Sequence, residues 1–136
     1  MKILLTVLLI GLMAAPAFAQ SGQWVTASGN LVIQIAPCGE ALCGTAIRQL
    51  ANHSMSDPNA IISGPSPIGL KILRDFAPAG DNTWSGQIYN RENGKTYRCR
   101  MKVLSAYELE IHPYVGIPLF GQTQIWHRAT DAADAK

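Results

Sequence analysis

The chain has 136 residues and a formal net charge of +2 at pH 7. A charge so close to zero gives no electrostatic basis for binding nucleic acid or an anionic membrane surface, and neither is expected as a partner. The length allows a single domain with one hydrophobic core.

The first nineteen residues are typical of a secretory signal peptide. Lys2 precedes an apolar run over residues 3–13, and Ala17-Phe18-Ala19 is a small-residue cleavage motif. The run is too short for a transmembrane anchor. We therefore expect a signal peptide at residues 1–19, cleavage before Gln20, and a periplasmic or secreted mature chain with no membrane insertion.

Export makes disulfides possible, and three cysteines follow the signal segment. Cys38 and Cys43 enclose a four-residue turn, which predicts a bridge between them. Cys99 lies on the apolar side of an alternating segment, where a small buried thiol is more common than a nucleophile. A bridge from Cys99 to one of the other two is an alternative. These spacings do not suit a zinc site.

Alternation of apolar and polar side chains is clearest between positions 84 and 128. In residues 97–103 basic side chains separate the apolar ones, and in residues 107–112 glutamates and a histidine do so. A period of two predicts strands with one apolar and one polar face. Asn93-Gly94 favours a two-residue type I′ turn, because both residues tolerate positive φ. That turn places Trp84 opposite Val103, and Ile88 opposite Cys99.

A second turn supports the same inward face. A three-residue loop at 104–106 predicts four cross-strand pairs: Lys102 with Glu108, Arg100 with Glu110, Arg98 with His112, and Met101 with Leu109. Opposite charges across strands stabilise a sheet. We therefore interpret the two glutamates as partners of basic residues rather than as a catalytic carboxylate pair.

Eight short strands are predicted in all, at residues 22–25, 31–35, 44–50 and 68–76, three within 84–112, and 121–128. Residues 51–67 are predicted to form a long loop, and loops of this length usually either cover a site or are mobile. A sandwich or a barrel fits this spacing, and closure into a barrel removes exposed edges. We predict an all-β, small eight-stranded antiparallel up-and-down barrel over residues 20–130, with a fraying tail at 131–136.

Gly22-x-Trp24 on the first strand and Arg128 on the last resemble the lipocalin signature, in which an arginine lies over a tryptophan and closes one end of the barrel. Four longer motifs are C-G-E-A-L-C-G, P-I-G-L-K-I-L, I-Y-N-R-E-N-G-K-T-Y-R-C-R-M and Y-V-G-I-P-L-F-G-Q-T-Q-I-W-H-R. Together they resemble the bacterial exported family called domain of unknown function 2147, over nearly the whole mature chain. The resemblance implies a lipocalin-like barrel without an established activity.

The long loop departs from that family. Its members usually carry N-P-D-P with arginines there, whereas this chain has Ser56-Asp57-Pro58-Asn59 and no arginine between Arg48 and Arg74. A role of those arginines in relatives therefore does not extend to this chain.

Catalytic and cofactor motifs are missing from the sequence. The histidines at positions 53, 112 and 127 are dispersed, and no G-x-S-x-G, dinucleotide or P-loop pattern occurs. We expect no catalytic residues, no metal and no cofactor, and a protein that is not an enzyme.

A ligand pocket is the remaining hypothesis. If Arg128 points inward over Trp24, Gln124 and Trp126 share its parity and also point inward. With Trp84 and Met101 they are the expected ligand-binding residues, and an apolar interior with few polar groups suits a small molecule. The tyrosines at positions 89, 97 and 114 gather near strand ends, where they would form a rim or a partner surface.

The leading hypothesis is an exported lipocalin-like protein that binds a small apolar or amphipathic molecule in the bacterial envelope. The first alternative is an interaction module with a filled barrel, which would bind proteins through the long loop and the apolar connector 115–120. The second is an enzyme of unrecognised type. The sequence does not determine the oligomeric state.

Overall fold

The computed structural model describes residues 20–55, 57–117 and 121–130. They form eight strands in the order β1 (Gly22–Val25), β2 (Leu31–Cys38), β3 (Ala41–Gln49), β4 (Lys71–Gly80), β5 (Thr83–Asn90), β6 (Lys95–Val103), β7 (Glu108–Tyr114) and β8 (Gln124–Arg128). The predicted signal peptide and tail lie outside the described residues. Within those residues no helix is long and apolar enough to cross a membrane.

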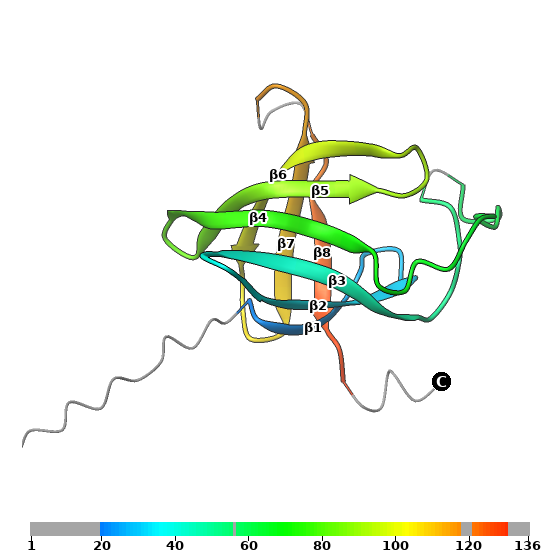
Figure 1. Cartoon of the computed structure of the whole chain (residues 1–136), viewed down its shortest axis with the longest axis horizontal. Coiled ribbons are helices and arrows are strands. Elements are labelled where there is room, and N and C mark those ends of the chain that lie inside the picture. Colours follow the sequence, from blue (N-terminus) through cyan, green and yellow to red (C-terminus); the bar gives the residue numbers. More distant parts are fainter. Residues whose placement is uncertain (1–19, 56, 118–120, 131–136) are drawn as a thin grey trace, which may run out of the picture.

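Each strand pairs antiparallel with the next, and β8 pairs with β1, so the sheet closes (Figure 1). The prediction of an all-β, eight-stranded up-and-down barrel is confirmed. Strand limits differ most in β4, which was predicted to end at Phe76 but continues through Pro78 to Gly80. Irregular pairing with β5 around these positions accommodates the proline.

The β5–β6 hairpin has a wider turn than the two-residue turn predicted at Asn93-Gly94. Asn90 pairs with Lys95, so residues 91–94 form a four-residue loop. The Asn90 side-chain oxygen accepts the backbone N–H of Glu92 at 2.9 Å, and its carbonyl accepts that of Gly94 at 2.8 Å. The strand register is therefore displaced by two residues.

This displacement corrects the predicted pairs of β5 with β6. Trp84 lies opposite Met101 rather than Val103, and Cys99 lies opposite Gly86 rather than Ile88. Because side chains alternate with a period of two, a two-residue shift leaves every side chain on its predicted face.

The β6–β7 hairpin is displaced in the same way. The backbone N–H groups of Leu104 and Ser105 both donate to the Glu108 carbonyl, at 3.1 and 3.3 Å, which lengthens the predicted three-residue loop. The predicted partners are consequently wrong, and the observed pairs are Lys102 with Glu110, Arg100 with His112, Arg98 with Tyr114, and Met101 with Ile111. The inward face is again unchanged.

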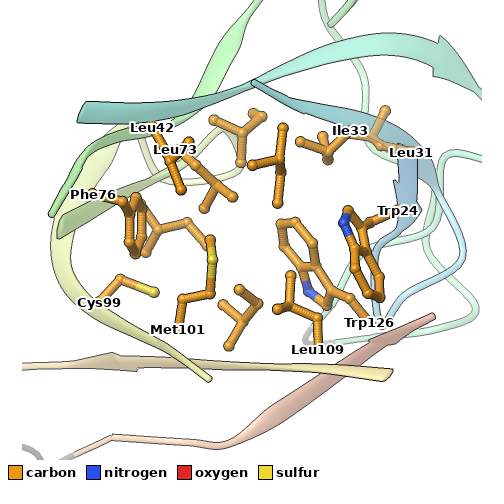
Figure 2. Packing of buried hydrophobic residues seen from close by; sticks show 14 of the residues in the cluster. Trp24, Leu31, Ile33, Leu42, Leu73, Phe76, Cys99, Met101, Leu109 and Trp126 are labelled. Carbon is orange, nitrogen blue, oxygen red and sulfur yellow. The ribbon is translucent and has the colours of Figure 1, made fainter. Parts of the chain in front are cut away.

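The barrel has two different ends. At one, which we call the closed end, the turns between β2 and β3, β4 and β5, and β6 and β7 are short. At the other, the open end, the connections are residues 26–30, 50–70, 91–94 and 115–123. Side chains fill the closed half, and Figure 2 shows Phe76, Cys99 and Met101 grouped within this packing.

Glycine 86 is required by the packing of the closed half. A Cβ atom there would lie 2.7 Å from the Phe76 ring and from the Arg74 carbonyl oxygen. Cys99, opposite Gly86, is fully buried, and burial raises the pKa of its thiol to about 12. It is a buried, unpaired cysteine, as predicted.

A disulfide joins Cys38 and Cys43 across the β2–β3 turn, as predicted, with 5.8 Å between their Cα atoms. The alternative bridge to Cys99 is excluded. The bond closes one of the short turns at the closed end of the barrel.

Candidate ligand-binding cavity

A cavity of about 1120 Å³ opens at the open end of the barrel. All four open-end connections contribute to its wall. Its buried apolar lining residues, which we call the floor, are Leu31, Ile72, Ile88 and Trp126. Ligand pockets in proteins commonly measure about 300–1,000 Å³ and combine apolar walls with a few polar groups. This cavity is slightly larger than that range and likewise combines a buried apolar lining with polar groups.

Trp126 and Gln124 are brought together at the cavity, as the parity of β8 predicts. The Trp126 indole is only 2% exposed, and its Nε1–H donates to Gln124 Oε1 at 3.2 Å. An indole nitrogen can only donate, so this bond fixes which end of the amide faces Trp126. The amide oxygen of Gln124 is therefore engaged by Trp126, and its Nε2 group lies on the other side of the amide.

Three tyrosines line the cavity, at positions 89, 97 and 114. Asn93 Nδ2 donates to the Tyr97 hydroxyl at 2.8 Å. The predicted gathering of these tyrosines near the strand ends is confirmed, and they place aromatic surface and hydroxyl groups around the cavity mouth.

The long loop folds back on itself over the mouth. His53 bridges to Ile61, and the Ser54 N–H donates to the Ala60 carbonyl at 2.9 Å. The Asn52 side chain also donates to the Ile62 carbonyl. We call residues 52–62 the flap, of which position 56 lies outside the described part. Five flap residues, from Ser54 to Ile62, line the cavity together with the neighbouring Ser63.

Asn30 attaches one side of the flap to the β1–β2 connection. It is buried, with 3% of its surface exposed. Its Nδ2 donates to the His53 carbonyl at 2.6 Å, and its Oδ1 accepts the His53 N–H at 3.0 Å. These two bonds satisfy an amide that would otherwise be costly to bury.

Two charged residues of the β5–β6 turn attach the other side of the flap. Arg91 Nη2 donates to Asn52 Oδ1 at 2.8 Å, and Glu92 Oε1 accepts the Met55 N–H at 2.9 Å. In Figure 1 the long loop and the β5–β6 turn accordingly lie at the same end of the barrel. The sequence predicts a long loop here, as a cover over a site or a mobile segment, but does not indicate the roles of Asn30, Arg91 and Glu92.

Two of the predicted ligand-binding residues lie elsewhere. Met101 is fully buried in the packed core, and Trp84, its partner across the strands, packs against that core near the closed end. Neither lines the cavity. Both were correctly assigned to the inner face, but alternation does not tell how far along the barrel axis a side chain lies.

Trp24 and Arg128 close the opposite end, as predicted from the resemblance. The guanidinium carbon of Arg128 lies 4.0 Å from the centre of the Trp24 ring. Its Nη1 donates to the Ser21 carbonyl at 2.5 Å and its Nε to the Ala106 carbonyl at 3.0 Å. Gly22 makes room for this contact, because a Cβ there would lie 2.8 Å from Nη1.

The family described as "Uncharacterized protein conserved in bacteria (DUF2147)" matches residues 22–128. This match covers all eight strands and both halves of the barrel. The chain belongs to the DUF2147 family. No curated protein matches it.

A solved structure similar to this DUF2147 chain is described as "Protein HP1028 from the human pathogen Helicobacter pylori belongs to the lipocalin family". The identity is 19%, with a TM-score of 0.62 over 82% of this chain and 84% of the other. The similarity supports the lipocalin-like fold of the DUF2147 barrel.

The histidines of this DUF2147 chain do not come together. His112 Nδ1 and Thr123 Oγ1 lie 3.0 Å apart, His127 is exposed, and the His53 backbone is bound by Asn30. Among residues 20–55, 57–117 and 121–130, no three histidine, cysteine, aspartate or glutamate side chains gather as metal ligands. The described residues that line the cavity provide apolar surface and hydrogen-bonding groups.

Proposed function

We propose that this DUF2147 protein is an exported, non-catalytic binding protein, and that it holds a small apolar or amphipathic molecule in the bacterial envelope. The observation that carries the proposal is the apolar floor of the open-end cavity, formed by Leu31, Ile72, Ile88 and Trp126 beneath a polar rim. Apolar surface at the bottom of an open cavity is stabilised when a ligand removes it from water.

The magnitude of that effect depends on the length of the ligand's apolar chain. Each buried methylene contributes about 0.8 kcal/mol, so a chain of eight contributes about 6 kcal/mol. Loss of translational and rotational freedom opposes association, which leaves a net affinity that depends on the fit and on the polar group. A micromolar dissociation constant corresponds to about 8 kcal/mol, so it requires a chain longer than eight methylenes together with further contacts to the wall.

Export is supported by one feature of the sequence and one of the structure. The first nineteen residues have the pattern of a signal peptide, and Cys38 pairs with Cys43. Structural disulfides are typical of oxidising compartments outside the cytoplasm.

The cavity is tested by filling it. In the variant Ile88→Trp an indole ring replaces the smaller aliphatic side chain in the floor, and the matched control Ile47→Trp places the same ring on β3 at a side chain that is 39% exposed. Titration with the neutral fluorophore N-phenyl-1-naphthylamine should give saturable binding to the wild type and the control, and at least about tenfold weaker binding to Ile88→Trp. Equal binding by all three would contradict the proposal. Thermal melting checks that each variant is folded.

A second candidate function, docking of a protein in the envelope, is favoured by apolar side chains exposed around the mouth. Ile61 is 68% exposed and Val115 63% exposed, on separate connections. The double variant Ile61→Ser with Val115→Ser should leave uptake of the fluorophore within about twofold of the wild type if these residues serve a protein partner, because the floor is unchanged. Loss of uptake would assign them to the ligand site instead.

A further inference from the structure

We infer that the ligand's polar group is uncharged: the cavity selects amphiphiles with an ester, hydroxyl or amide group over those with a carboxylate or an ammonium group. This inference rests on the proposed function. The evidence for it is the set of hydrogen bonds that the polar side chains of the cavity wall make within the protein.

The charged side chains of the described wall are Arg91 and Glu92, adjacent in one turn and opposite in sign. Both attach the flap, Arg91 through Asn52 and Glu92 through the Met55 N–H. A ligand carboxylate that recruited Arg91 would approach Glu92 and compete with Asn52. A ligand ammonium that recruited Glu92 would approach Arg91 and remove the acceptor of Met55.

The rest of the wall cannot replace the water around an ion. The floor is apolar, and the remaining polar lining consists of hydroxyl, amide and backbone groups. A charge moved out of water without an opposite charge pays a large desolvation penalty, whereas a neutral polar group needs one or two hydrogen bonds. The wall therefore matches a neutral group.

Gln124 is positioned to supply such a bond next to the floor. Its Oε1 accepts Trp126 Nε1–H, which leaves the Nε2 hydrogens as donors. An ester or hydroxyl oxygen is satisfied by a single donor of this kind. This makes Gln124 the proposed specificity-determining residue.

Three ligands with the same twelve-carbon chain test the inference: methyl dodecanoate, dodecanoate and dodecylammonium. At pH 8, displacement of N-phenyl-1-naphthylamine should show the ester binding at least about tenfold more tightly than either ion. Dodecanoate binding as tightly as the ester would overturn the inference while leaving the proposed function standing. Displacement by none of the three would overturn both.

Substitution of Gln124 separates recognition from general hydrophobicity. Gln124→Leu also removes the acceptor of Trp126 Nε1–H, so the two ligands are compared within this variant: the ester should weaken about tenfold more than the fluorophore, which lacks an acceptor oxygen. Gln124→Lys should tighten dodecanoate about tenfold or more by providing an opposite charge. The control Gln23→Leu, on exposed surface of β1, should change neither ligand. An unchanged ester affinity in Gln124→Leu would contradict the role assigned to this residue.

A change of pH allows one ligand, dodecanoate, to be compared in its charged and its neutral form. As the pH falls toward the carboxyl pKa of about 4–5, dodecanoate should approach the affinity of the ester, whose own affinity should stay constant. Dodecanoate affinity that stays flat or falls relative to the ester would contradict the inference.

Discussion

The two ends of this barrel are built from the same eight strands but differ in how their interior is packed and in the connections between strands. At the closed end, turns are short and large side chains such as Phe76, Met101 and Trp24 fill the interior. At the open end, connections that include the long segment 50–70 surround a cavity whose flap is held by Asn30, Arg91 and Glu92. Folding stability should therefore depend mainly on the closed end, and binding on the open end.

The largest expected effect is at the closed end. Phe76→Ala removes a ring that is 1% exposed and packs against Gly86. We expect the free energy of unfolding to fall by about 3–5 kcal/mol, because the surrounding strands cannot collapse into the space. Chemical denaturation measures it. A loss below 1 kcal/mol would show that the closed half is less tightly packed than described.

Alkaline pH should destabilise the same region through Cys99. Because burial raises the pKa of this thiol to about 12, the folded chain keeps its proton while the unfolded chain, with an ordinary pKa near 8.5, loses it. Stability should therefore be fully present below about pH 8.5 and fall by up to about 1.4 kcal/mol per pH unit between about 9 and 12. Cys99→Ala should lack this component. Denaturation curves of both proteins over this range, compared by difference, isolate it from other titrating groups.

Loss of the disulfide should have a smaller effect. The bond between Cys38 and Cys43 closes a short loop, and removing it by the double variant Cys38→Ser with Cys43→Ser should cost about 2 kcal/mol. Fluorophore binding at the open end should remain within about twofold, measured under conditions where the variant is folded. A loss of binding in the folded variant would show that the two ends are coupled.

The smallest effect on global stability is expected at the flap. Glu92→Ala removes the acceptor of the Met55 N–H and should cost about 0.5–1.5 kcal/mol, felt locally. Hydrogen exchange at Met55 should accelerate, while amides in β6 keep their protection. Glu92→Gln retains an acceptor oxygen and serves as the matched control. Equal acceleration in β6 would contradict a locally attached flap.

Much of the fold was predictable because it depends on local alternation. The inward face of β6 follows from the spacing of Cys99 and Met101, and a two-residue error in register does not disturb it. The register itself was missed because side-chain and backbone bonds at Asn90 and Glu108 widen the turns. Such bonds depend on the folded geometry of each loop.

The candidate site was predictable only in part. Gln124 and Trp126 follow from the parity of β8 with Arg128, and the tyrosine rim from positions near strand ends. The attachment of the flap joins residues 23 to 39 positions apart, so no local pattern indicates it. A buried asparagine and an Arg-Glu pair in a turn are common on ordinary protein surfaces as well.

The central claim, that the open end holds a ligand, is tested most directly by native mass spectrometry of the protein isolated from the bacterium that produces it. We expect a chain carrying one small molecule, retained at gentle activation and absent from the Ile88→Trp variant. A wild-type protein with only the mass of the bare chain, which also fails to take up N-phenyl-1-naphthylamine, would contradict it.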